Sequence, residues 1–113
     1  MRIEGQALRV QVFIGEGDRW EHRPLSDAIV TMLRSEGLAG ATVVRGVEGF
    51  GASSRIHLEN ILRLSEDLPV IVTFVDTAEK VEAVLPKLDD MVSGGLVTVD
   101  EVHVYRYRPS NNA

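Results

Sequence analysis

A glycine-rich stretch near the middle of the chain has the residue types of an anion site. It places three glycines around a phenylalanine and then two serines and an arginine: Gly46, Gly49, Phe50, Gly51, Ser53, Ser54 and Arg55. Glycines let backbone N–H groups approach an anion closely, hydroxyls add donors, and a guanidinium adds charge. The same glycines also suit a tight turn, and spacing alone favours the turn because neither a phosphate-loop nor a dinucleotide fingerprint is present.

Two arginines near the carboxyl end form a second candidate anion site. Arg106 and Arg108 share the parity of Val102 and Val104, which we expect to face the core side of the sheet. Two arginines cannot stay buried without partners. They must therefore project past the packed region into a cleft, or bind carboxylates of a neighbouring subunit, and the residues leave both readings open.

The histidines do not form a convincing metal set. His22, His57 and His103 are far apart in sequence, and a structural zinc site needs four good ligands, so we expect ordinary surface histidines. The chain also lacks a nucleophile–base pair and a convincing two-carboxylate site, which predicts a binding protein and not an enzyme.

The composition narrows the class of protein further. The net charge is -5 and the 12 basic residues are scattered, which argues against a nucleic-acid binder. Absence of cysteine excludes disulfide scaffolds, thiolate metal sites and cysteine nucleophiles. The length of 113 residues suits one domain over residues 1–113. With neither a signal-peptide core nor an apolar run of ~20 residues, we expect a cytoplasmic protein without membrane insertion.

The first half of the chain predicts a strand and a helix. Alternating apolar residues indicate a strand over residues 7–14, and a polar loop follows over residues 15–23, with Trp20 covering a core edge. Pro24 fits the first turn of a helix that ends at Gly37. Its apolar face is expected to hold Leu25, Ala28, Ile29, Met32 and Leu33.

The second half predicts three strands and another helix. Residues 41–47 and 70–75 are expected strands, the latter covered on both faces because its apolar run is nearly unbroken. The capping-box spacing of Asp76 and Glu79 opens a helix with a buried stripe, and Gly94-Gly95 ends it. The stripe comprises Ala78, Val81, Val84, Leu85, Leu88 and Met91 or Val92.

Two irregularities are expected in this half. Pro86 should kink or interrupt the helix. The last strand runs from Leu96 to Arg108, and a slip in its apolar parity at Asp100-Glu101 predicts a bulge or short turn there.

The element order is therefore β-α-β-β-α-β. Right-handed crossovers favour an α+β, ferredoxin-like arrangement with a four-stranded antiparallel sheet backed by two helices. The other face of such a sheet is bare, and Phe13 lies on it, which favours a homo-oligomer.

The segment 49–68 is long for a loop in a small domain and is expected to be functional. The tail 109–113 is expected to fray.

The central sequence resembles an uncharacterised bacterial and archaeal family of PII-like proteins. The resemblance is carried by residues 40–51 and 53–57, by Leu-Ser-Glu-Asp-Leu-Pro at 64–69 and by Val-Asp-Thr at 75–77, within a match over roughly residues 8–104. The same stretch is more distantly similar to the PII nitrogen-regulatory proteins, which have Gly-Phe-Gly at the root of a long ligand-sensing loop.

This resemblance implies a ferredoxin-like homotrimer with clefts between subunits that hold adenine nucleotides and no catalytic cofactor. It implies that the loop over residues 49–68 reports the bound state to a partner, often a membrane transporter or an enzyme. Arg106-Tyr107-Arg108 matches an Arg-x-Arg that contacts nucleotide phosphates in PII proteins. The glycine-rich stretch and these two arginines thus form the predicted ligand site.

Several positions depart from the PII pattern. Ala52 and Ser53 stand where PII proteins have Arg-Gln, so the basis for binding 2-oxoglutarate is missing. Asn60 falls near the position of a modified loop tyrosine, and residues 94–99 replace a phosphate-wrapping stretch. Two alternatives stay open: an adaptor oligomer without a small ligand, and a metal-binding trimer related to the copper-tolerance branch of this fold. The second would need His57 or His22 to act with acids across an interface.

Overall fold

The computed structural model describes residues 3–51 and 67–110. It contains two helices and six strands, of which two are very short. In chain order they are β1 (Ile3–Gly15), β2 (Arg19–Trp20), β3 (Arg23–Pro24), α1 (Leu25–Ser35), β4 (Thr42–Arg45), β5 (Pro69–Asp76), α2 (Ala78–Met91) and β6 (Leu96–Tyr107).

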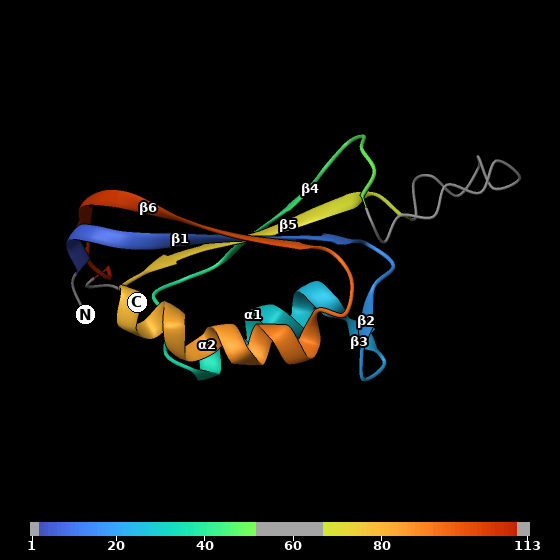
Figure 1. Ribbon diagram of the computed structural model, residues 1–113, viewed down its shortest axis with the longest axis horizontal. Coiled ribbons are helices and arrows are strands. Elements are labelled where there is room, and N and C mark those ends of the chain that lie inside the picture. Colours follow the sequence, from blue (N-terminus) through green and yellow to red (C-terminus); the bar gives the residue numbers. More distant parts are fainter. Residues whose placement is uncertain (1–2, 52–66, 111–113) are drawn as a thin grey trace, which may run out of the picture.

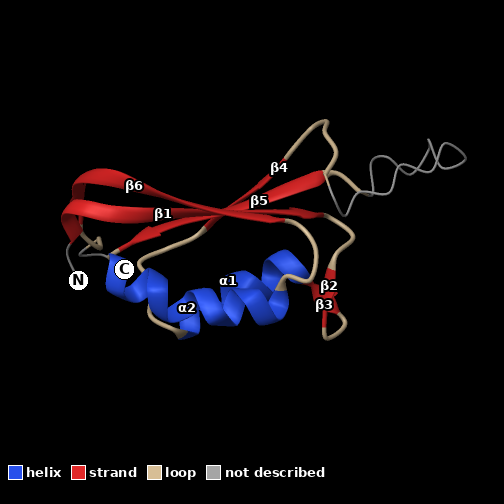
Figure 2. Cartoon of the chain, in the orientation of Figure 1, coloured by secondary structure: helices blue, strands red, loops and turns tan. Residues whose placement is uncertain are grey.

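The four long strands form one antiparallel sheet, and both helices lie on one face of it (Figures 1 and 2). The strand order is β4-β5-β1-β6, with the first and third of the long strands adjacent at the centre. This is the ferredoxin-like α+β architecture that the element order predicted. Among the described residues, no helix is both long and apolar enough to cross a membrane.

The core lies between the helices and the inward positions of the two central strands. Every second residue of β1 and β5 points to the helices because side chains alternate along a strand. The buried cluster comprises Val10, Val12, Ile14, Leu25, Ala28, Ile29, Leu33, Val70, Val72, Phe74, Val81, Val84, Leu88 and Met91. The other face of β5 is half-buried, so the expectation that both of its faces are covered is wrong for the described chain.

Helix α1 ends as predicted, at a left-handed glycine. Gly37 has φ +80°, its N–H donates to the Arg34 carbonyl, and the next N–H, of Leu38, donates to the Leu33 carbonyl. These bonds form a Schellman motif, which satisfies carbonyls that the helix would otherwise leave open. The chain leaves the helix in a fixed direction as a result. At the other end of α1, Pro24 lies at the N-cap, one position before the predicted first turn.

The predicted loop over residues 15–23 contains a short hairpin of β2 and β3. Arg19 pairs with Pro24 and Trp20 with Arg23, and the two residues of the turn, Glu21 and His22, have φ of +48° and +69°. Neither is a glycine or asparagine, and for this reason a two-residue turn could not be predicted from the residue types. Trp20 packs half-buried against the core, as expected.

Helix α2 differs from its prediction at four places. Thr77, and not Asp76, is the N-cap: its hydroxyl accepts from the Lys80 N–H at 3.3 Å. Ala78 is exposed. The helix continues through Pro86 without interruption. It ends at Met91, before the two predicted glycines.

Strand β6 is continuous through Asp100-Glu101, so the predicted bulge or turn there is wrong. Its register with β1 is unbroken from Leu96 to Val104, and the irregularity lies between Val104 and Tyr107, opposite Gly5 and Ile3. The parity slip had another cause. Val97 and Val99 lie opposite the core residues Val12 and Val10 of β1. Val102 and Val104 lie opposite Ala7 and Gly5, on the other face of the sheet.

Candidate ligand-binding site

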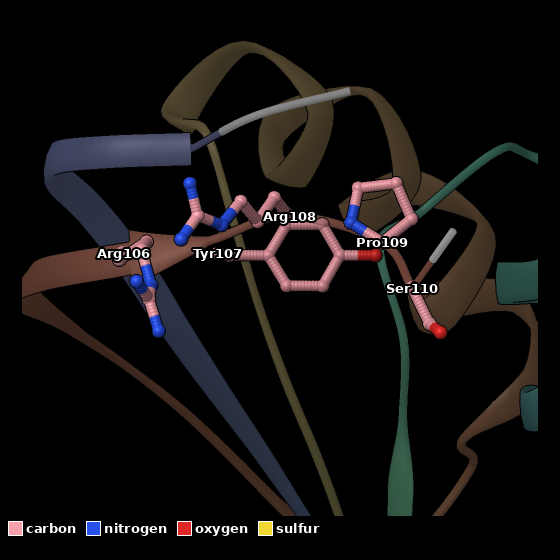
Figure 3. Close-up of a pocket in the computed structure, with 5 residues that line it drawn as sticks. All are labelled: Arg106, Tyr107, Arg108, Pro109 and Ser110. Carbon is pink, nitrogen blue, oxygen red and sulfur yellow. The ribbon is translucent and has the colours of Figure 1, made fainter. Parts of the chain in front are cut away.

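Arg106 and Arg108 lie at the end of β6, beside an open hollow of about 540 Å³ (Figure 3). The hollow is lined by five consecutive residues, Arg106, Tyr107, Arg108, Pro109 and Ser110. The irregularity between Val104 and Tyr107, where the strand departs from regular pairing with β1, overlaps the first of these residues. A volume of this size lies within the range of small-molecule sites.

Both arginines are exposed, and the structure forms no hydrogen bond or ion pair from either guanidinium to the residues it describes. The prediction that the two arginines lie on the core side of the sheet with Val102 and Val104 is wrong. These two valines lie opposite Ala7 and Gly5, on the face away from the helices, and the register with β1 shifts after Val104. Both guanidiniums are exposed beside the hollow, where each can donate charge-assisted hydrogen bonds to an anion.

Tyr107 joins this hollow to a distant part of the chain. Its ring is half-buried, and its hydroxyl donates to the Ala39 carbonyl oxygen at 3.1 Å. Ala39 belongs to the connection between α1 and β4. Sequence reasoning missed this contact, because tyrosine between two arginines carries no signal of what its hydroxyl reaches.

The same connection is fixed from two other elements. Asp76, which is fully buried at the end of β5, accepts from the Ala39 N–H at 2.8 Å and from the Thr77 N–H at 2.7 Å. On α2, Lys80 donates from Nζ to the Gly37 carbonyl at 2.8 Å. Both backbone polar groups of Ala39 are therefore held by side chains from different strands.

The glycines of the central stretch pack against a proline. Gly46 donates its N–H to the Pro69 carbonyl at 2.7 Å, and a Cβ added to Gly46 would lie 2.8 Å from Pro69 Cγ. A Cβ on Gly49 would meet the same atom at 3.0 Å. Both glycines thus have a steric reason to be present, and Gly49, with φ +152°, also has the positive φ on which the turn interpretation rested. Phe50 is 80% exposed, and Gly51 is exposed beside it. Ser53, Ser54 and Arg55 lie outside the described residues, as does most of the predicted loop over residues 49–68.

The two halves of the predicted site lie at opposite ends of the sheet. Arg45, just before the glycines, pairs with Val70, which pairs with Ile14, whereas Tyr107 pairs with Ile3. Eleven residues of β1 separate these levels, a span of roughly 35 Å at the usual rise of a strand. One chain does not bring the glycines and the arginines together.

The glycine end also carries acidic groups. Glu16 pairs with Arg45 at 3.1 Å, and Asp18 accepts from the Gly15 N–H at 2.9 Å. Burial raises the pKa of Asp67, and repulsion from the Asp18 carboxylate adds to the increase. Negative charge at this end opposes an anion, so within one chain the arginine end is the better candidate.

No group of three or more metal-ligating side chains forms among the residues that the structure describes. His22 and His103 are exposed, as surface histidines are expected to be. His57, which the metal-binding alternative would use, lies outside the described ranges.

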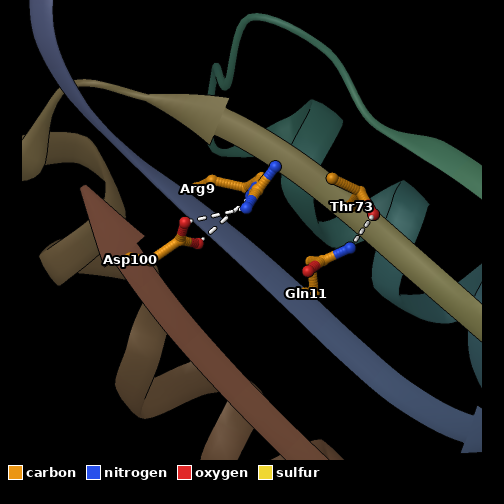
Figure 4. A network of polar contacts seen from close by, with 4 residues as sticks. All are labelled: Arg9, Gln11, Thr73 and Asp100. Atoms are coloured by element: carbon orange, nitrogen blue, oxygen red, sulfur yellow. Dashed lines mark hydrogen bonds and ion pairs between the residues drawn. The ribbon is translucent and has the colours of Figure 1, made fainter. Parts of the chain in front are cut away.

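The open face of the sheet has ordered rows across its strands. An apolar row crosses all four strands, with Phe13 opposite both Ile71 and Leu96, and Ile71 opposite Val44. The adjacent rows are polar: Gln11 approaches Thr73 at 3.5 Å, and Arg9 makes two hydrogen bonds of 3.1 and 2.8 Å to Asp100 (Figure 4). No described helix covers these rows.

The family of the chain is shown by sequence comparison. Residues 7–104 match the model of DUF190, described as an uncharacterised ACR. The chain belongs to this family. It is 37% identical over 102 residues to an UPF0166 protein of Methanocaldococcus jannaschii, covering 89% of this chain and 94% of that one. It is 30% identical over 104 residues to an UPF0166 protein of Aquifex aeolicus, covering 92% and 97%.

Among solved structures, the fold of this DUF190 protein is similar to that of CPII from Thiomonas intermedia K12, a nitrogen regulatory PII-like protein. One CPII structure, bound to ADP, AMP and bicarbonate, matches with a TM-score of 0.62 and 15% identity, over 92% of this chain and 91% of that one. Another, bound to ADP and bicarbonate, matches with a TM-score of 0.53 and 19% identity, again over 92% and 91%. The similarity shows a PII-like fold, as the sequence had predicted.

Proposed function

We propose that this DUF190 protein is a regulatory protein that binds an adenine nucleotide in clefts between the subunits of a homotrimer. It reports the bound state to a protein partner, either a membrane transporter or an enzyme, and it is not itself an enzyme. The observation that carries the proposal is the pair of exposed guanidiniums, Arg106 and Arg108, beside a hollow of about 540 Å³. Phosphate oxygens are suitable ligands for arginine, which can bind them through two parallel hydrogen bonds.

The separation of the glycines from the arginines supports a cleft between subunits. In one copy the two groups lie roughly 35 Å apart along the sheet, at ~3.3 Å per residue. A site that uses both requires the arginine end of one copy and the glycine end of another. The complete proposed set is Gly46, Gly49, Phe50, Gly51, Ser53, Ser54, Arg55, Arg106 and Arg108.

Self-association through the open sheet face supplies such a contact. The apolar row from Val44 to Leu96 exposes large side chains in one copy: Val44 is 51% and Leu96 is 56% accessible. Burying them against other copies removes apolar surface from water. The nucleotide is the ligand of choice because CPII, whose fold this chain shares, is bound to ADP and AMP.

A binding experiment with matched arginine variants tests the proposal. We would measure the mass of the purified protein and its affinity for ADP, ATP and AMP by calorimetry, in the wild type, Arg106→Ala, Arg108→Ala and Arg19→Ala. Arg19 is an exposed arginine on the β2–β3 hairpin and serves as the control. A nucleotide at ~100 times its dissociation constant should stabilise the wild type by roughly 2.7 kcal/mol.

We expect each of the two site variants to lose at least roughly ten-fold in affinity, because a charge-assisted hydrogen bond contributes about 1.5–3 kcal/mol. Arg19→Ala should bind as the wild type does. Full affinity in both Arg106→Ala and Arg108→Ala would refute the phosphate contacts. A well-folded trimer that no nucleotide stabilises would favour the adaptor, and a copurifying metal lost with His22→Ala or His57→Ala would favour the metal-binding alternative.

A further inference from the structure

A single tyrosine lies between the two candidate phosphate ligands and reaches away from them. Arg106 and Arg108 are exposed at the end of β6, whereas the intervening Tyr107 is half-buried. Figure 3 shows its ring extending from the strand away from the arginine side chains. Any displacement of this strand end also displaces the ring, because the three residues are consecutive.

The partner of the tyrosine is held firmly from its other side. The Ala39 carbonyl accepts from the Tyr107 hydroxyl at 3.1 Å, while the Ala39 N–H donates to the buried carboxylate of Asp76 at 2.8 Å. Lys80 holds the Gly37 carbonyl two residues earlier. Of these three side chains, only Tyr107 also lines the hollow beside the arginines.

The segment held in this way forms the wall of a second hollow. A cavity of about 330 Å³ lies at the end of α1 and is lined by Val30, Leu33, Arg34, Leu38, Ala39, Gly40 and Ala41. Ala39 thus lines one hollow and accepts a hydrogen bond from a residue that lines the other. A hydrogen bond therefore connects a residue that lines one hollow to a residue that lines the other.

We infer that Tyr107 is a positioning residue that couples ligand binding at Arg106 and Arg108 to the conformation of residues 37–41. An anion bound by both guanidiniums holds the end of β6 in place. It thereby also holds the Tyr107 hydroxyl that donates to the Ala39 carbonyl. Linkage is reciprocal, so a well-held 37–41 segment also favours the arrangement of the arginines that binds the anion. This inference rests on the proposed nucleotide site and adds the route by which occupancy reaches the start of β4.

Hydrogen exchange on the full chain tests the coupling, with Tyr107→Phe against the matched control Tyr105→Phe. Tyr105 lies two residues away on the same strand, and its side chain is 87% exposed. Without ligand, we expect Tyr107→Phe to speed exchange of the amides of residues 38–41 by roughly five-fold, since one hydrogen bond that holds the segment is lost. Tyr105→Phe should leave these amides unchanged, and the amides of β1 should be unchanged in both.

Addition of ADP supplies the decisive comparison. In the wild type and in Tyr105→Phe, ADP should slow exchange over residues 37–41, and in Tyr107→Phe this slowing should disappear while ADP affinity falls by roughly three- to ten-fold. Equal slowing and equal affinity in all three proteins would overturn the inference and leave Tyr107 a purely structural residue. If the wild type binds none of ADP, ATP and AMP, the proposed function and the coupling both fail, whereas loss of slowing in Tyr105→Phe as well would overturn the coupling alone.

Discussion

The carboxylate of Asp76 and the backbone of Ala39 are joined by a hydrogen bond of 2.8 Å, although 37 residues separate them in sequence. The carboxylate is fully buried, and its second oxygen accepts from the Thr77 N–H. Asp76 therefore fixes the start of α2 and the connection between α1 and β4 at the same time. The hydrogen bonds satisfy a polar group whose burial would otherwise be costly.

Asp76→Ala is expected to lower the free energy of unfolding by about 2–4 kcal/mol, because two backbone N–H groups lose their acceptor. Asp76→Asn keeps one acceptor oxygen and should cost less. Urea denaturation followed by circular dichroism measures both losses. Asp89→Ala, at an exposed position of α2, is the control and should change the free energy by less than about 0.5 kcal/mol. A loss of that small size in Asp76→Ala would contradict the anchoring role.

Charged substitutions in the apolar row should dissociate the proposed oligomer without unfolding the chain. Val44→Glu and Leu96→Glu place charges at sites already exposed in one copy, so the cost falls on association. Native mass spectrometry and light scattering should show a trimeric wild type and smaller species for both variants. Ala83→Glu, on the exposed side of α2, is the control and should leave the mass unchanged. A monomeric wild type, or trimeric variants, would contradict assembly through this face.

The raised pKa of Asp67 predicts a specific pH dependence of stability. The folded chain holds the proton of the Asp67 carboxyl more tightly than the unfolded chain does, because its pKa is higher. The stability that this proton contributes is therefore complete below the unfolded pKa near 3.9 and is lost as the pH rises through the higher folded pKa. Above the folded pKa, Asp67 is charged in the folded chain, and the full destabilising effect of this partly buried charge is present. Asp67→Asn should therefore raise the melting temperature at pH 7, with a gain that disappears near pH 3.

Solvent screening keeps this gain small, at roughly a few tenths of a kcal/mol. The control is Glu82→Gln, at an exposed position in the middle of α2. It removes a negative charge from a solvent-exposed position and should leave the melting temperature unchanged at both pH values. A gain for Asp67→Asn that is equal at pH 3 and pH 7 would show that charge is not its cause.

The sequence predicted the layers and the order of elements because both depend on local patterns. Val10, Val12 and Ile14 alternate along β1, and Gly37 marks the end of α1 through its backbone freedom. The errors lie where the outcome depends on a distant partner. Asp76 resembles an N-cap in sequence, but its carboxylate is used by Ala39, so Thr77 takes the cap.

The candidate site was predictable only in its residue types. Two closely spaced arginines indicated anion chemistry, and the structure leaves their side chains exposed beside a hollow. Their parity was misjudged because the register shift after Val104 depends on pairing with Gly5 and Ile3, a hundred residues earlier in the chain. The distance between the glycine end and the arginine end follows from topology and not from any local motif.

That distance has a consequence for mixed assemblies. If each cleft takes its arginines from one copy and its glycines from another, chains damaged at opposite ends can complement each other. A copy with altered arginines and a copy with an altered glycine stretch would, when mixed, form some clefts from two intact halves. Nucleotide binding regained by combining two proteins that do not bind would then be a property of the arrangement of subunits, and not of either polypeptide.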